Sequence, residues 1–149
     1  MERTLIIIKP DAVQRGLTGE IIKRFEQRGL KIVAMKMVQV DRQLAERHYD
    51  VHRERSFFPK LIDYIISSPA VVIALEGKNA IKAARQTIGA TNPLEATPGT
   101  IRGDFGMEVG RNLVHGSDSV ENAAIELALW FSENDFAPHT RVTEAWLYE

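Results

Sequence analysis

The chain contains no cysteine, which excludes disulfides, thiolate nucleophiles and cysteine-based metal sites. It also has no large excess of one charge, since 19 Lys and Arg residues stand against 20 Asp and Glu residues. Bulk charge therefore argues neither for nor against a nucleic-acid or membrane partner, and any anion site must be a local cluster. No apolar run approaches the roughly 20 residues that span a bilayer. We therefore expect a cytoplasmic protein with no membrane partner.

Apolar runs and periodic segments alternate along the 149 residues, a length that suits one domain with its own core. We expect strands at residues 5–8, 31–40 and 70–75, and helices at 18–28, 42–49, 58–67 and 78–87. A turn is expected at 9–11, because proline cannot continue a strand ladder. This alternation predicts an α+β or α/β sandwich and does not choose between them. No repeat or linker divides the chain, so residues 1–149 are expected to form a single domain.

Residues 89–116 differ from the rest, because six of the ten glycines lie there and no sustained period of 2 or 3.6 appears. A long loop inside a compact domain is usually functional. Leu113 and Val114 are expected to form a short strand just before His115. A helix follows through residue 131, capped by Asp118 or Ser119. Such a helix start attracts anions, and a histidine with its usual pKa of about 6.5 is largely neutral and nucleophilic near pH 7. The segment predicts a histidine that meets a phosphate.

The helix after His115 adds a carboxylate. Glu126 is placed to orient His115 or its neighbour Ser117. The opposite face of this helix is expected to belong to the core, and it consists of Val120, Ala123, Ala124, Leu127 and Phe131.

Phosphoryl transfer also needs cations that neutralise the oxygens of the transferring group. Three basic side chains and one hydroxyl are candidates for this role: Lys9, Arg85, Arg102 and Thr91. Neither a P-loop nor a G-x-G-x-x-G motif occurs. His48 and His52 stand four residues apart without a convincing third ligand, so no protein-held metal site is predicted, and both are expected to lack the setting of His115.

The segment 112–119, NLVHGSDS, closely resembles the active-site signature of the nucleoside diphosphate kinases. The match extends through TLIIIKPDAVQ at 4–14, TNP at 91–93, PGTIRGDF at 98–105 and WLYE at 146–149. The resemblance implies a ferredoxin-like, four-stranded antiparallel sheet in the order β-α-β-β-α-β, with helices on one face and a long loop before the last strand. It also implies ping-pong transfer of the γ-phosphate from a nucleoside triphosphate, mainly ATP, to a nucleoside diphosphate through phosphorylated His115.

The resemblance further implies a role for each matched residue. The nucleophile is His115, supported by Tyr49, Glu126 and Ser117. The phosphates are held by Lys9, Arg85, Thr91 and Arg102, while Lys9 and Asn112 also reach the sugar hydroxyls. The base lies between Phe57, which stacks on one face, and Val109, which covers the other. Magnesium arrives with the nucleotide, bound mainly by phosphate oxygens. Members with both the loop around Pro93 and a long C-terminal tail are usually hexamers, so we expect a homo-hexamer.

Two other functions fit parts of the pattern. A histidine phosphocarrier or protein histidine kinase would use the same histidine but would not need Phe57, Asn112 and Lys9 as a nucleotide cradle. A nucleic-acid-binding module on a ferredoxin-like sheet would need exposed aromatic residues on neighbouring strands and a basic face. The expected middle strands, 32–40 and 70–75, contain no aromatic residue. We therefore expect no required nucleic acid.

Overall fold

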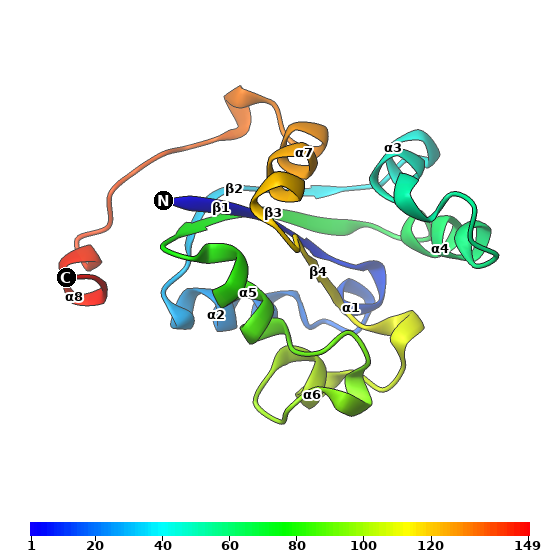
Figure 1. Ribbon diagram of the computed structural model, residues 1–149, viewed down its shortest axis with the longest axis horizontal. Coiled ribbons are helices and arrows are strands. Elements are labelled where there is room, and N and C mark those ends of the chain that lie inside the picture. The colour runs from blue at the N-terminus through cyan, green and yellow to red at the C-terminus, as the bar shows by residue number, and fades with distance from the viewer.

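A computed structural model describes residues 1–149 and contains one four-stranded antiparallel sheet in the order β2-β3-β1-β4. The strands are β1 (Glu2–Ile8), β2 (Lys31–Val38), β3 (Ala70–Gly77) and β4 (Val114–Gly116). The α-helices are α1 (Pro10–Gln14), α2 (Thr18–Arg28), α3 (Arg42–His48), α4 (Phe58–Ile65), α5 (Ala80–Ile88), α6 (Ile101–Phe105), α7 (Val120–Trp130) and α8 (Glu144–Leu147). The order β1, α2, β2, β3, α5, β4 confirms the ferredoxin-like α+β fold (Figure 1).

Helices cover both faces of the sheet rather than one (Figure 1). Successive side chains of a strand point to opposite faces. In β1, Leu5 and Ile7 therefore join a core cluster with residues of α3, α4 and α7, whereas Ile6 and Ile8 join a second cluster with residues of α2 and α5. All four side chains are fully buried. The expectation of helices on one face only was wrong, and the reason is that the additional helices α3, α4 and α7 pack on the second face.

Three short helices, α1, α6 and α8, occupy segments where none was expected. α1 begins at Pro10, because a proline at the first helical position loses no hydrogen bond and already has a helical φ. α6 lies inside the glycine-rich segment, where the Thr100 side chain accepts a hydrogen bond from the Gly103 N–H and caps the helix. In addition, β4 contains His115 itself, whereas the expected strand ended before it.

The ends of the longer helices follow the expected signals, but one helix face does not. α2 stops at Gly29, which has a φ of 106°. α7 is capped by Ser119, whose Oγ accepts a hydrogen bond from the Asn122 N–H at 3.1 Å. Of the five residues expected in the core, Ala123 and Phe131 are buried and Leu127 packs against the core, whereas Val120 and Ala124 are exposed. Trp130 adds a further core contact, and the outer face of α7 keeps apolar residues that are not covered.

The C-terminal segment leaves α7 and runs along the edge of the molecule to α8 (Figure 1). One backbone hydrogen bond, from the Ala137 N–H to the Val33 carbonyl at 2.7 Å, ties its start to β2. Farther along, Val142 and Trp146 are 95% and 92% exposed. None of the helices is both long enough and apolar enough to cross a membrane.

Candidate active site

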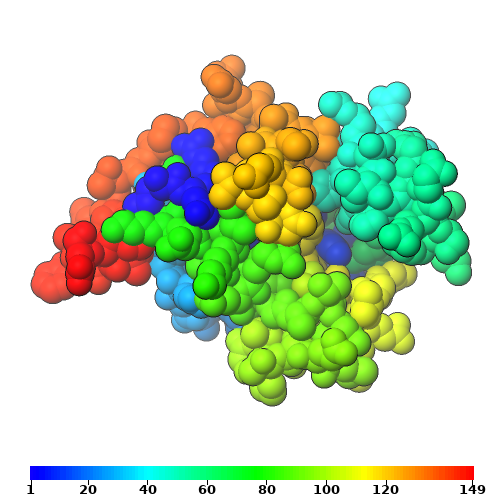
Figure 2. All heavy atoms as spheres, in the orientation of Figure 1, coloured from blue at the N-terminus to red at the C-terminus, as the bar shows by residue number.

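A cleft of about 920 Å³ opens between α7, the α3–α4 segment and the glycine-rich segment, and Figure 2 shows the hollow between them. Its walls include ten of the eleven residues predicted for the site: Lys9, Tyr49, Phe57, Arg85, Thr91, Arg102, Val109, Asn112, His115 and Glu126. The eleventh, Ser117, is fully buried and bonds to Glu126. A smaller cavity of about 390 Å³, lined in part by residues of α5 and α8, contains none of them. The fold therefore gathers the predicted set in one place.

His115, Glu126 and Ser117 form a hydrogen-bonded group at the centre of the cleft. His115 Nε2 lies 2.7 Å from Glu126 Oε1, and Ser117 Oγ donates to the same oxygen at 2.8 Å. The Leu5 N–H donates to Ser117 Oγ at 3.1 Å, which directs the hydroxyl proton toward Glu126. An ionised carboxylate only accepts hydrogen bonds, so neutral His115 carries its proton on Nε2. Its Nδ1 then keeps a free lone pair, which is the requirement for a nucleophile.

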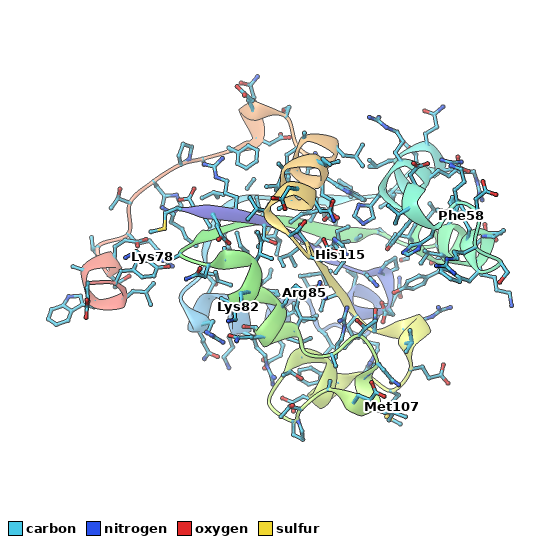
Figure 3. The ribbon with its side chains drawn as sticks, viewed as in Figure 1. Phe58, Lys78, Lys82, Arg85, Met107 and His115 are labelled. Carbon is cyan, nitrogen blue, oxygen red and sulfur yellow. The ribbon has the colours of Figure 1, made fainter.

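Three cations line the cleft beside His115. Lys9 Nζ donates to Asn112 Oδ1 at 2.8 Å. Burial, together with the neighbouring Arg102 charge, lowers the pKa of Lys9 to about 8. Burial and the charge of Arg85 lower the pKa of Arg102 to about 10. Arg85 comes from α5, next to β4, which carries His115 (Figure 3). Because the charge of Arg102 lowers the pKa of Lys9 and the charge of Arg85 lowers that of Arg102, an anion bound among these cations would be stabilised.

Arg102 also holds the glycine-rich segment in place. Its guanidinium donates to the backbone carbonyls of Asn112 at 3.0 Å, Gly89 at 3.2 Å and Val114 at 2.6 Å. A guanidinium has five N–H donors, so two remain after these three bonds. Arg102 can therefore fix the shape of the cleft and still bind an anion.

Two further polar groups remain available to a ligand. The Tyr49 hydroxyl is buried and has no hydrogen-bond partner. Burial and the negative charges of Glu126 and Asp11 raise the pKa of Tyr49, so the hydroxyl is a neutral donor. A buried hydroxyl without a partner costs about 1–3 kcal/mol, which an acceptor in the cleft would recover. Thr91 is exposed and lines the cleft, where its backbone carbonyl accepts from Asn112 Nδ2 at 3.0 Å.

Two apolar side chains line the cleft although they are about half exposed. Phe57 is 48% exposed and Val109 is 51% exposed. Phe58, by contrast, is 7% exposed and belongs to the core. An exposed aromatic ring in a cleft can stack on the π-face of any base. The pair Phe57–Phe58 therefore divides into one residue for the cleft and one for the core.

His48 is a residue of the cleft that the sequence reasoning missed. Its ring lies against His115, with centroids 4.8 Å apart and planes at 83°. Its Nδ1 accepts a hydrogen bond from Trp130 Nε1 at 3.0 Å. Burial and the neighbouring His115 and Lys9 lower the pKa of His48 well below 6.5. The expectation that His48 stands apart was wrong, because α3 and α7 pack side by side and no sequence spacing relates residues 48 and 115.

Other cleft residues carried no sequence signal either. Three of them are basic side chains that resemble ordinary surface charges in the sequence: Arg47, Lys60 and Arg111. His52 lines the cleft as well, and its ring stacks on Tyr49 with centroids 6.4 Å apart. His52 is absent from the one cluster of potential metal ligands, which consists of His48, His115 and Glu126.

Asp118 is a cleft carboxylate that does not bond to His115. A hydrogen bond from Asn122 and the charge of Arg85 lower the pKa of Asp118, so it is ionised at neutral pH. A magnesium ion needs about six oxygen ligands, and the cleft offers no cage of that size. The residues present fit a magnesium ion whose ligands come mainly from a bound phosphate chain and water, with Asp118 at its side.

Comparison with known proteins agrees with this geometry. The sequence model of a family described as nucleoside diphosphate kinase matches residues 2–136. A nucleoside diphosphate kinase from a Picosynechococcus strain is 62% identical over 149 residues, which cover both chains completely. The crystal structure of a nucleoside diphosphate kinase family protein from Babesia bovis has a TM-score of 0.97 at 46% identity, covering 99% of this chain and all of that chain. A halophilic nucleoside diphosphate kinase from Halobacterium salinarum, in complex with CDP, has a TM-score of 0.97 at 43% identity, covering 99% of each chain.

Proposed function

Because this chain belongs to the nucleoside diphosphate kinase family and is a phosphotransferase acting on nucleotides, we propose that it works by a ping-pong mechanism through phosphorylated His115. The reaction moves the terminal phosphate of a nucleoside triphosphate to a nucleoside diphosphate. The observation that carries the proposal is the 2.7 Å contact between His115 Nε2 and Glu126, which leaves Nδ1 free to attack.

In the first half-reaction, His115 Nδ1 forms a bond to the γ-phosphorus of ATP. The bond from that phosphorus to the bridging oxygen breaks, and ADP leaves with the electron pair. The ring becomes positively charged as Nδ1 is phosphorylated, and the Glu126 carboxylate stabilises this charge through Nε2–H. In the second half-reaction, a terminal oxygen of another nucleoside diphosphate attacks the same phosphorus. The P–N bond breaks, and His115 returns to its neutral form.

The cleft residues supply the electrostatic part of catalysis. Lys9, Arg85 and Arg102 offset the negative charge that spreads over the transferring group. Tyr49 donates its free hydroxyl to a phosphoryl oxygen, and Thr91 binds the phosphate chain from the rim. These contacts are strongest to the phosphoryl group in the transition state, so they increase the rate of the chemical step.

Sugar and base recognition use the remaining residues. Lys9 and Asn112, which are bonded to each other, reach the sugar hydroxyls. Phe57 stacks on one face of the base and Val109 covers the other. We also propose that Asp118 would help to hold a magnesium ion that binds with the nucleotide, and that the ion would supply positive charge against the phosphate oxygens. Removal of the ion with a chelator should stop transfer, and added magnesium should restore it.

The experiment that tests this mechanism is labelling with ATP that carries radioactive phosphate in its γ-position. The protein should retain label that is lost in acid and survives alkali, as a phosphoramidate does and a phosphoserine ester does not. Any nucleoside diphosphate should then remove the label and become the triphosphate. His115→Asn should abolish labelling and transfer while nucleotide binding persists, whereas His139→Asn, at an exposed position, should change neither. Comparable transfer by His115→Asn would mean direct transfer or another nucleophile.

The same experiment separates the alternatives. A phosphocarrier would pass the label to a protein acceptor and would leave nucleoside diphosphates unlabelled. A nucleic-acid module on an open sheet has no support from the fold, because helices cover both faces of this sheet. Nucleotide transfer therefore remains the function that the cleft supports best.

We propose that the chain assembles into a homo-hexamer, as the resemblance predicts. Two features support assembly. The edge strand β2 exposes Met35 and Met37, and the C-terminal segment exposes Val142 and Trp146. Contact with neighbouring copies would bury this apolar surface. Light scattering should give about 100 kDa for six chains of 16.8 kDa each, and a monomer or dimer at micromolar concentration would contradict the proposal. The single domain over residues 1–149 and the cytoplasmic location stay predictions.

A further inference from the structure

Trp130 and His48 form a buried pair beside the nucleophile. The Trp130 side chain is 3% exposed, and its indole N–H donates to His48 Nδ1 at 3.0 Å. The ring centroids of His48 and Trp130 lie 5.5 Å apart, and those of His48 and His115 lie 4.8 Å apart. His48 therefore links Trp130 to His115 through ring contacts on both sides.

The hydrogen bond determines the tautomer of His48. An indole nitrogen is a donor only, so the atom that faces it must offer a lone pair. His48 Nδ1 is therefore unprotonated. A histidine ring whose Nδ1 carries no proton is neutral and holds one proton. That proton must lie on Nε2.

The side chains needed for a zinc site lie together beside the nucleophile, namely His48, His115 and Glu126. One ligand atom from each lies within 4.8 Å of the others, and two histidines with one glutamate, plus water, are a known zinc ligand set. A zinc ion needs a lone pair on the ring nitrogen that binds it. For His48 to bind through Nε2, its proton would have to move to Nδ1, where it would face the Trp130 N–H. Two donors would then oppose each other in a buried place.

We propose that Trp130 fixes His48 as the Nε2–H tautomer and thereby prevents the His48–His115–Glu126 cluster from capturing a transition-metal ion such as Zn²⁺. The functional meaning rests on the proposed mechanism, since a zinc ion on His115 would either occupy the Nδ1 lone pair or replace the Nε2–H bond to Glu126 that stabilises the charged ring. Magnesium is not affected, because it prefers oxygen ligands and arrives with phosphate. Trp130 is thus a positioning residue that acts through His48.

The tautomer can be measured on the unaltered protein. Long-range proton–nitrogen NMR spectra of protein labelled with ¹⁵N in its histidine rings should show His48 with an unprotonated Nδ1 and a protonated Nε2 at pH 7. Loss of one set of signals in His48→Gln assigns them. A charged His48, or a proton on Nδ1, would overturn the proposal. This measurement involves no nucleotide, so it is independent of whether His115 is the nucleophile.

Zinc binding to the nucleotide-free protein gives the second test. By calorimetry, Trp130→Phe should bind Zn²⁺ about tenfold to a hundredfold more tightly than the unaltered protein, because the opposing donor is gone. The double variant Trp130→Phe/His48→Gln should lose this gain. Trp146→Phe is the matched control, since Trp146 is 92% exposed and should not change zinc affinity. Equal affinity in Trp130→Phe and the unaltered protein, or a gain that survives loss of His48, would refute the role of Trp130.

Discussion

Replacement of Glu126 by alanine should slow phosphorylation of His115 by about ten- to a hundredfold while leaving nucleotide affinity nearly unchanged. Glu126 Oε1 accepts from His115 Nε2 at 2.7 Å and from Ser117 Oγ at 2.8 Å. Only the bond to His115 strengthens during the reaction, because the ring becomes positive as Nδ1 is phosphorylated. A hydrogen bond to a charged group contributes about 1.5–3 kcal/mol, and about 1.4 kcal/mol corresponds to a factor of ten in rate.

The size of the effect is limited by solvent. The side chains of His115 and Glu126 are 22% and 18% exposed, so water can replace part of the lost interaction, and the lower half of the range is expected. Glu126→Gln separates orientation from charge, because its amide oxygen can still accept the Nε2–H bond. We expect only about a three- to sixfold reduction for this variant, since a bond between neutral groups keeps about half of the interaction.

The assay is a single turnover with γ-labelled ATP, stopped within milliseconds, in which acid-labile protein label is counted. ADP affinity is measured separately by calorimetry. Glu121→Gln, an exposed position on the same helix, should react at the normal rate. Phosphorylation of Glu126→Ala at that rate would show that Glu126 neither sets the tautomer of His115 nor stabilises its charge. A loss of ADP affinity with no loss of rate would place Glu126 in nucleotide binding instead.

Three other predictions concern charge, selectivity and stability. Lys9 has a pKa near 8 and must be protonated to hold phosphate, so ADP affinity measured by calorimetry should fall as pH rises through about 8. Lys9→Arg should remove this pH dependence, and equal affinity of the unaltered protein at pH 7 and 9 would contradict the role of Lys9. ADP, GDP, CDP and UDP, with their deoxy forms, should all be accepted because Phe57 stacks on any base, and a preference beyond about a thousandfold in kcat/KM would show a base-reading pocket. Phe25→Ala should lower the free energy of unfolding, measured in urea, by about 3–5 kcal/mol because Phe25 is 1% exposed. A loss below about 1 kcal/mol would mean that the core residues around α2 can close the cavity left by the ring.

Several features of the fold could be predicted because they depend on local chemistry. The run Leu5 to Ile8 indicated a buried strand, and Gly29 and Ser119 marked helix ends through their own backbone and side-chain preferences. The errors arose where local signals compete. Pro10 ends a strand and also begins a helix, so α1 was read as a turn. Val120 and Ala124 on the outer face of α7 were read as core, because composition does not say which side of a helix the rest of the chain will cover.

The alternation of strands and helices can be read from the chain without its structure, and so can the residue types at the site, including a histidine near a serine and several cations. These follow from backbone stereochemistry and from motifs within short segments. Which atoms meet depends instead on how the elements pack. The contacting residues come from three elements: His48 from α3, Glu126 and Trp130 from α7, and His115 from β4. Their contacts depend on how the helices pack on the second face of the sheet. Side-chain packing over such distances in the chain sets the tautomers of both histidines, and no spacing in the sequence carries that information.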